Sequence, residues 1–141
     1  MILVERATEE DIADILAIDR AIGITDRGEM LVEAVVHRQA LIAREGERKL
    51  GFAVVQRHFF GHAFIELLVV HPEARRRGAA SALLAYIEKT QPGDKLFTST
   101  NESNTVMQAL LDKAGYVRSG HIDNLDEGDP EIVYFKRLER A

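Results

Sequence analysis

The sequence predicts a single α/β domain, of the α+β kind, in which about four helices cover a mixed sheet. Three observations favour this class: predicted strands and helices alternate along the whole chain, no linker or internal repeat interrupts them, and one apolar strand leads through a glycine-containing turn into a helix. The 141 residues, 46% hydrophobic and 29% charged, are typical of one globular domain. We therefore expect residues 1–141 to form one domain.

The first half of the chain predicts a strand, two helices and a hairpin. Thr8-Glu9-Glu10-Asp11 resembles a capping box, which starts a helix, and Gly23 ends that helix. Glu45-Gly46-Glu47 is typical of a turn between two strands. The expected elements are a strand at 2–6, helices at 9–22 and 27–37, and strands at 40–44 and 50–56.

The second half predicts two further helices among four strands. The first helix has an apolar ridge at i, i+3, i+4 and i+7, formed by Ala80, Leu83, Leu84 and Ile87. The second has a ridge of Met107, Leu110, Leu111 and Ala114, and Gly115 follows where a left-handed residue ends a helix. The expected strands lie at 63–70, 96–100, 116–122 and 132–138, which gives the order β-α-α-β-β-β-α-β-α-β-β.

A short basic loop joins the strand at 63–70 to the next helix. The strand stops at Pro72, and the loop then carries three consecutive arginines into Gly78. The first N–H groups of a helix lack internal partners and the helix dipole adds positive charge there, so such a turn binds anions. Arginine forks suit phosphate oxygens, and a glycine lets a phosphate approach the backbone. The segment predicts a pyrophosphate site, with a solvated basic turn as the alternative.

The same residues carry a resemblance to a known family. Arg75-Arg76-Arg77-Gly78-Ala79-Ala80 resembles the Arg/Gln-x-x-Gly-x-Gly/Ala signature of the GCN5-related N-acetyltransferases (GNAT), and Val70-His71-Pro72-Glu73 resembles the lead-in to that signature. The resemblance implies a mostly antiparallel sheet and acetyl-CoA as co-substrate. It also implies that Arg75, Arg76, Arg77, Gly78, Ala79 and Ala80 contact the cofactor pyrophosphate. The backbone of Leu68, Val69 and Val70 would pair with pantetheine.

A second motif of that family lies near the later helix. Asn104, Lys113, Gly115 and Tyr116 resemble an Asn that opens a helix ending in Lys-x-Gly-Phe/Tyr. The resemblance implies that Asn104 hydrogen-bonds the pantetheine region, with Asn101 as a weaker candidate. A plain N-cap is the alternative role of Asn104, and the two roles are compatible.

The sequence departs from the family where a general acid is expected. Many members carry a Tyr seven residues after that Asn, which protonates the leaving thiolate, and Leu111 stands there. The coenzyme A thiol should titrate near ~8.5, like cysteine, so its thiolate is already a tolerable leaving group. Water, Ser103 or Tyr134 could supply the proton, and Tyr116 is expected in the core. The missing acid also supports an alternative function, an acyl-CoA-binding module without catalysis.

Glu66 is the candidate general base. An aliphatic amine has a pKa near ~10.4, so a carboxylate or a water chain must take its proton at neutral pH. Strand alternation sets Glu66, Leu68 and Val70 on one face, where apolar neighbours are expected to desolvate the carboxylate and raise its pKa. Many family members use a Glu at about this position. The alternative is a solvated or salt-bridged strand residue.

The sequence says less about the substrate that accepts the acetyl group and about the residues that would bind it. The resemblance implies an amine, on a small molecule, a peptide N-terminus or a lysine, and residues near Asp26, Arg27 and Glu33 as part of its wall. A loop before the last strand holds five carboxylates that could steer a cation, or that simply form a solvated turn. They are Asp123, Asp126, Glu127, Asp129 and Glu131.

Composition limits which other partners the protein is expected to bind. A net charge of −5 disfavours nucleic-acid binding, which leaves a basic-loop interaction domain as the least favoured function. The chain has no cysteine, and His58 and His62 flank an expected turn, so we expect no metal. No apolar run approaches the ~20 residues of a membrane helix. The N-terminal residues show no leader character, so a cytoplasmic location is expected. Family members often dimerise, and no expected element identifies a partner face.

Overall fold

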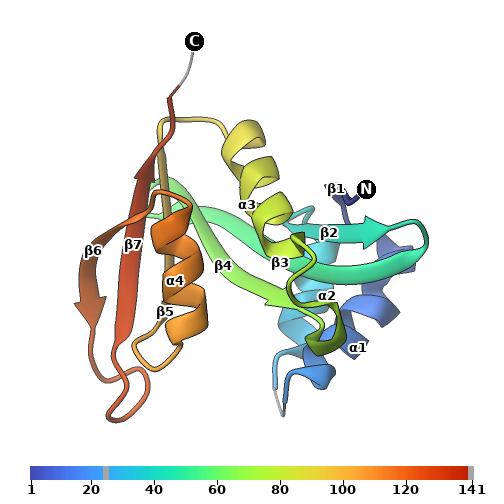
Figure 1. Ribbon diagram of the computed structural model, residues 1–141, viewed down its shortest axis with the longest axis horizontal. Helices are drawn as coiled ribbons and strands as arrows, with labels where there is room; N and C mark the ends of the chain where they lie inside the picture. The colour runs from blue at the N-terminus through green and yellow to red at the C-terminus, as the bar shows by residue number, and fades with distance from the viewer. Residues whose placement is uncertain (24–25, 140–141) are drawn as a thin grey trace. The chain divides into compact units, whose positions relative to one another are not determined.

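The computed structural model describes residues 1–23 and 26–139 (Figure 1). Its elements follow the predicted order, with ends within a few residues of those expected, and two short 3-10 turns, Glu9–Asp11 and Pro72–Ala74, are added. The strands and helices are β1 (Leu3–Arg6), α1 (Ile12–Ala21), α2 (Gly28–Val36), β2 (Ala40–Glu45), β3 (Arg48–Phe59), β4 (His62–Val70), α3 (Ala79–Thr90), β5 (Lys95–Asn101), α4 (Thr105–Lys113), β6 (Val117–Ile122) and β7 (Glu131–Arg137).

The strands form a seven-stranded sheet in the order β1-β2-β3-β4-β5-β7-β6. The pairs β1·β2, β2·β3, β5·β7 and β6·β7 are antiparallel, whereas β4 and β5 are parallel. This parallel pairing runs from Ala63 opposite Leu96 to Ile65 opposite Thr98. Beyond that point β5 continues in register with β7 as far as Asn101 opposite Glu131. The fold class is confirmed: a mixed, mostly antiparallel sheet with helices.

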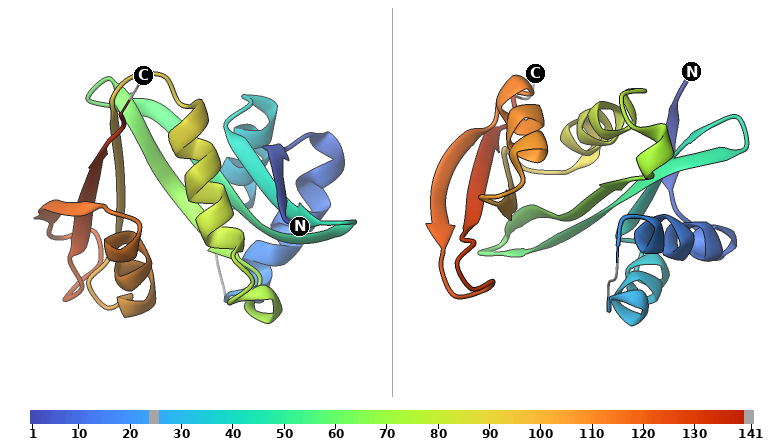
Figure 2. Two further views of the ribbon diagram at one scale, coloured as in Figure 1. Left: turned by 45° about the horizontal axis from the view of Figure 1, so that its top comes forward. Right: turned by 60° about the horizontal axis from the view of Figure 1, so that its bottom comes forward.

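The chain divides into two compact units, neither of which is a continuous segment. Unit 1 consists of Met1–Val55 and Leu67–Thr90, and unit 2 of Gln56–Glu66 and Gln91–Ala141. Both β3 and β4 therefore begin in one unit and end in the other. In unit 1, α1 and α2 lie on one face of β1 and β2, and α3 lies on the other face (Figure 2).

The core of unit 1 forms between helices α1 and α2 and the strands. Buried aliphatic residues of the two helices meet buried residues of β2 and β3, among them Ile15, Leu31, Ile42 and Phe52. The predicted capping box is present, because the Asp11 carboxylate accepts a hydrogen bond from the Thr8 backbone N–H at 2.9 Å. On α3 the buried ridge begins at Ala79 and not at the expected Ala80, which is half-buried.

The core of unit 2 forms between α4 and the sheet face of β5, β7 and β6. Leu96, Leu111, Tyr116 and Tyr134 are all buried there, so the expected core position of Tyr116 is confirmed. The opposite face of the unit carries a row of half-buried aromatic rings with centroids 4.6 to 5.2 Å apart. These rings are Phe59, Phe64, Phe97 and Phe135.

Candidate active site

The expected phosphate loop follows β4 in unit 1. The His71 backbone N–H donates to the Leu50 carbonyl oxygen at 2.8 Å, which ties the end of β4 to β3. The His71 Nδ1 atom accepts from the Glu73 backbone N–H at 3.1 Å and caps the short turn that Pro72 begins. Ala74 is buried beneath this turn. The chain is thus anchored on both sides of Pro72 before the arginines begin.

The loop exposes its arginines and turns on two left-handed residues. Arg75, Arg76 and Arg77 are exposed, and the backbone φ angles of Arg76 and Gly78 are +67° and +92°. A Cβ built on Gly78 would meet only the Ile2 Cδ1 atom, at 3.9 Å, so the space beside this backbone is open. Helix α3 begins one residue later, with its first N–H groups at this turn.

This loop brings together the kinds of group that an anion site uses. Three exposed guanidinium groups, an open glycine and a helix N-terminus lie within six consecutive residues, 75–80. One guanidinium is partly engaged, because Arg77 lies 3.5 Å from the Glu45 carboxylate in a pair that is nearly half exposed on both sides. Such an exposed pair is weak, so an anion could displace it.

The end of β4 lies close against β3. A Cβ on Gly51 would come within 2.5 Å of the Val69 carbonyl oxygen and 3.1 Å of the Val70 Cα atom. The absence of a side chain at Gly51 therefore sets how near the two strands approach. Val69 is buried, whereas Leu68 and Val70 are half-buried. Leu68, Val69 and Val70 lie in unit 1 with the loop, whereas Glu66 and Asn104 lie in unit 2.

Glu66 is the last residue of β4 in unit 2. Its side chain is exposed, so the expectation that apolar neighbours bury this carboxylate is wrong. Alternation gives the face of the strand correctly, but nothing covers this face of the unit at Glu66. Among the described residues Glu66 forms no ion pair, so the salt-bridged alternative is not observed.

The structure adds to this face Ser99, which sequence reasoning missed, and Glu131, which was expected only as one of the loop carboxylates. Glu66 is the residue after the last β4 residue paired with β5, and Ser99 is the residue after the last β5 residue paired with β4. The two side chains therefore occupy equivalent positions on the same face of the sheet. The Ser99 hydroxyl donates to the Glu131 carboxylate at 2.7 Å. A hydroxyl and a second carboxylate therefore accompany Glu66. The alternation within residues 95–101 and 131–137 could have placed them on one face.

Two of the loop carboxylates, Asp126 and Asp129, hold the turn between β5 and α4. The Asn101 side-chain amide donates to Asp126 at 2.8 Å, and the Ser103 hydroxyl donates to Asp129 at 2.6 Å. Ser103 is thereby a poor proton donor to any other group. Asn104 is exposed and its Oδ1 atom accepts from the Met107 N–H at 3.1 Å, which confirms its N-cap role. Its cofactor contact stays a prediction.

The candidate wall residue Arg27 is also occupied. Its guanidinium contacts the buried Asp19 carboxylate through two nitrogens, at 3.0 and 2.7 Å. This pair links α1 to the start of α2, and a buried carboxylate needs such a partner. Arg27 is therefore structural, while Asp26 and Glu33 are exposed.

Comparisons with known proteins identify the family of this chain. The family model for the Acetyltransferase (GNAT) family matches residues 10–116. An acetyltransferase of the GNAT family from Bacillus cereus is 37% identical, with 99% of each chain covered and a TM-score of 0.94. The chain belongs to the GNAT family. It is accordingly an acetyltransferase, in the class of acyl-CoA N-acyltransferases.

More distant GNAT structures share the fold. The ribosomal-protein-S18-alanine N-acetyltransferase of Escherichia coli is 18% identical, with 100% of this chain and 96% of that chain covered and a TM-score of 0.81. YncA of Salmonella typhimurium, solved with its cofactor acetyl-CoA, is 14% identical, with the same coverage and a TM-score of 0.79. A search of curated proteins finds no match.

Two further features of residues 1–23 and 26–139 bear on the class of site. Within these residues no cluster of three or more His, Cys, Asp or Glu side chains is arranged to hold a metal ion. None of the helices in this part of the chain has the length and apolar character that a membrane crossing requires.

Proposed function

We propose that the protein transfers the acetyl group of acetyl-CoA to a primary amine by direct attack of the amine on the thioester. The acceptor would be a small molecule, a peptide N-terminus or a lysine side chain. The observation that carries the proposal is the loop at residues 75–80, because three exposed arginines and the open backbone at Gly78 meet the N-terminus of α3. The acetyl-CoA in the YncA structure supports the same ligand.

Cofactor binding would use backbone and side chain in different places. Arg75, Arg76 and Arg77 would neutralise the pyrophosphate, and the N–H groups at Gly78, Ala79 and Ala80 would donate to its oxygens. The backbone of Leu68, Val69 and Val70 would pair with pantetheine, and an N–H of this segment would also suit the thioester oxygen. Asn104 would add a side-chain contact through its amide N–H while its oxygen caps α4.

The acceptor would lose its proton to Glu66. A primary amine arrives mainly as an ammonium ion, which an exposed carboxylate attracts, and the neutral amine must form before attack. Glu66 is exposed and unpaired among the described residues, so it can accept that proton directly or through water. Ser99 and Glu131 share its face and would hold the ammonium group beside it.

Titration calorimetry with acetyl-CoA tests the cofactor site. We expect one-site binding by the wild-type protein, and affinity at least about tenfold weaker in Arg77→Ala and in Gly78→Glu, since one loses a phosphate donor and the other fills the open backbone with a carboxylate. Matched controls are Arg20→Ala, an exposed arginine of α1, and Gly128→Glu, another left-handed glycine in open space. No binding at millimolar acetyl-CoA would overturn the proposal.

The second candidate function is an acyl-CoA-binding module without catalysis. The observation that favours it is Leu111, which is buried and has no proton to donate where many relatives have a Tyr. Release of thiol from acetyl-CoA, measured across a panel of amines and short peptides, separates the two functions. Binding without acceptor-dependent thiol release would support the module.

A further inference from the structure

Aromatic side chains form a row across strands β4, β5 and β7 of unit 2. The strand register places Phe64 opposite Phe97 and Phe97 opposite Phe135, so the three side chains leave the same face of the sheet. Together with Phe59 they form the aromatic row, whose half-buried rings have centroids 4.6 to 5.2 Å apart. Apolar residues scattered singly on a surface are ordinary, whereas a group of neighbouring rings on one face is typical of a binding site.

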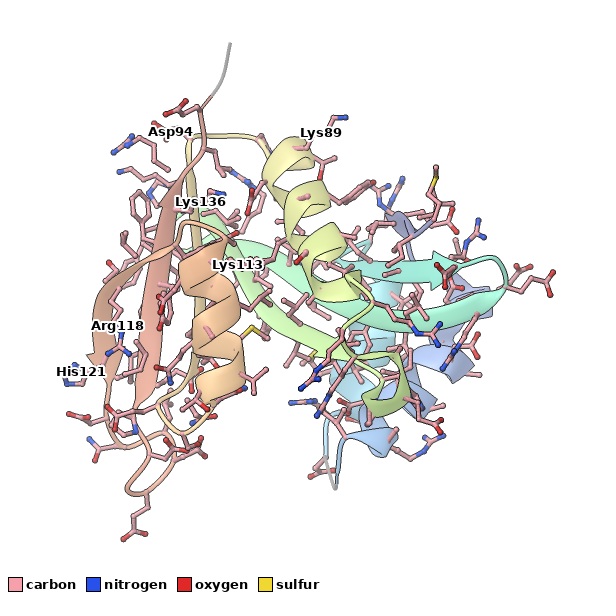
Figure 3. All side chains as sticks on the ribbon, in the orientation of Figure 1. Lys89, Asp94, Lys113, Arg118, His121 and Lys136 are labelled. Carbon is pink, nitrogen blue, oxygen red and sulfur yellow. The ribbon has the colours of Figure 1, made fainter. Side chains whose placement is uncertain are left out.

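The helix of unit 2 packs against the other face of these strands. Lys136 of β7 donates to the Ala114 carbonyl oxygen at the end of α4 at 2.7 Å, and Arg118 of β6 donates to Gln108 of α4 at 2.8 Å (Figure 3). Side chains alternate along β7, so Lys136 points away from the face of the aromatic row. In the described part of unit 2, α4 is the helix, and it therefore leaves the aromatic row uncovered.

Carboxylates lie at one side of the aromatic row. Glu66 is two residues beyond Phe64 on β4, and Ser99 is two residues beyond Phe97 on β5, so both share the face of the rings. The Ser99 hydroxyl donates to the carboxylate of Glu131 at 2.7 Å, which brings a second acid to the same side. This side of the row is therefore suited to an ammonium group.

The other side of the aromatic row is basic. Lys95, two residues before Phe97, lies opposite Arg137, two residues after Phe135. The Arg137 guanidinium lies 5.9 Å from the Phe135 ring centre, and its ion pair with Asp94 is exposed on both sides and so is weak. Two cations at this side would repel a second ammonium group on the same ligand.

We propose that this face binds the acceptor and that the acceptor is an arylalkylamine, a primary amine with an aromatic group and no second ammonium group. The inference rests on the proposed function, in which Glu66 takes the proton of the amine. Successive residues on one face of a strand are about 6.6–7 Å apart, which sets the distance between the carboxylates and the rings. A chain of about three carbon atoms, with bonds of ~1.5 Å, spans that distance from a ring centre to a nitrogen.

The test measures thiol release from acetyl-CoA with 3-phenylpropylamine and with n-propylamine, which differ in the ring alone. We expect kcat/KM of the wild type to be at least about tenfold higher for 3-phenylpropylamine, because the phenyl group is removed from water on the aromatic row. In Phe97→Ala this ratio should fall at least about fivefold. The control is Phe60→Ala, whose ring is 88% exposed in the turn between β3 and β4, and it should keep the wild-type ratio.

The basic side is tested with n-hexylamine and 1,6-diaminohexane, which differ in the second amino group. We expect kcat/KM of the wild type to be at least about fivefold lower for the diamine, because its second ammonium group meets Lys95 and Arg137. Arg137→Gln, an exposed change that leaves the rings in place, should narrow this difference. Equal use of the two amines by the wild type would overturn the exclusion of a second ammonium group.

The outcomes separate this inference from the proposed function. A wild-type ratio near one for the first two amines, or a ratio unchanged in Phe97→Ala, overturns the arylalkylamine assignment and leaves acetyl transfer in place. No thiol release with any amine or peptide overturns both. Sedimentation velocity tests the other occupant, a second copy of the chain. A wild-type dimer that Phe97→Ala converts to a monomer would show that the rings form a subunit interface, and would also overturn the assignment.

Discussion

Glu66 combines exposure with a position at the end of the parallel pairing between β4 and β5. We expect Glu66→Gln to lower kcat by about 10²- to 10⁴-fold, the usual contribution of a positioned base, while acetyl-CoA affinity stays unchanged. Steady-state kinetics with calorimetry measures both quantities. Glu73→Gln, an exposed glutamate beside the loop, is the control and should retain full turnover. Unchanged kcat in Glu66→Gln would remove this residue from the mechanism.

The Ser99–Glu131 pair shows what a single residue can and cannot reveal in a sequence. Each residue taken alone is an ordinary polar strand position, and only the register between β5 and β7 brings the hydroxyl to the carboxylate. The expected burial of Glu66 was wrong for a related reason. Alternation predicts which side chains share a face, whereas the packing of distant elements decides whether that face is covered.

At the scale of the strand, Gly51 determines how closely β3 approaches the segment of β4 that is proposed to bind pantetheine. In Gly51→Ala the new methyl group would come within 2.5 Å of the Val69 carbonyl oxygen, so backbone must move. We expect the free energy of unfolding to fall by about 1–3 kcal/mol, and acetyl-CoA affinity to fall with it, because β4 is displaced. Urea denaturation and calorimetry measure the two effects.

The matched control for this change is Gly28→Ala. A methyl group there would meet only Leu16 Cδ2, at 3.9 Å, at the start of α2, so stability should stay level or rise by up to about 1 kcal/mol. If Gly51→Ala were destabilised yet bound acetyl-CoA as the wild type does, the segment Leu68–Val70 would not contact the cofactor.

The capping box at the start of α1 predicts that the stability of the folded protein depends on pH. Burial raises the pKa of Asp11, but hydrogen bonds from Lys49 at 2.8 Å and from Thr8 outweigh it and hold that pKa below its ordinary value. A carboxylate with a lowered folded-state pKa stabilises the protein above the unfolded pKa of about 3.9, and the stabilisation is lost as pH falls through the folded pKa.

Asp11→Asn should therefore reduce the free energy of unfolding by about 1–2 kcal/mol at pH 7, and the difference from the wild type should shrink below about pH 4. Denaturation at pH 7 and pH 3 measures this change, with the exposed Asp112→Asn as control. A difference that stays constant over this pH range would show that the Asp11 carboxylate charge is not what stabilises the helix start.

Elements were predictable where the pattern is local. The ridge of α3, the N-cap at Asn104 and the left-handed Gly115 all depend on residues within a few positions of one another, and each is present in the structure. The pairs Asn101–Asp126 and Ser103–Asp129 join residues about 25 positions apart through strand pairing. Such contacts follow from register, which periodicity alone does not determine.

For the whole molecule, the division into two units raises the question of how many cooperative transitions the chain has. The chain passes between the units after Val55, Glu66 and Thr90, and both β3 and β4 run through both. A strand that unfolds in one unit removes pairing for its continuation in the other. We therefore infer that residues 1–141 unfold as one domain, although they form two compact units.

Differential scanning calorimetry tests this inference. We expect one transition with equal calorimetric and van't Hoff enthalpies, and a single peak that moves upward with acetyl-CoA. At a ligand concentration of about 100 times Kd the stabilisation is about 2.7 kcal/mol, which for a chain of this size corresponds to a shift of roughly 5–12 °C. Two resolved transitions, with acetyl-CoA moving only one, would show that the units unfold separately and that only one of them binds the cofactor.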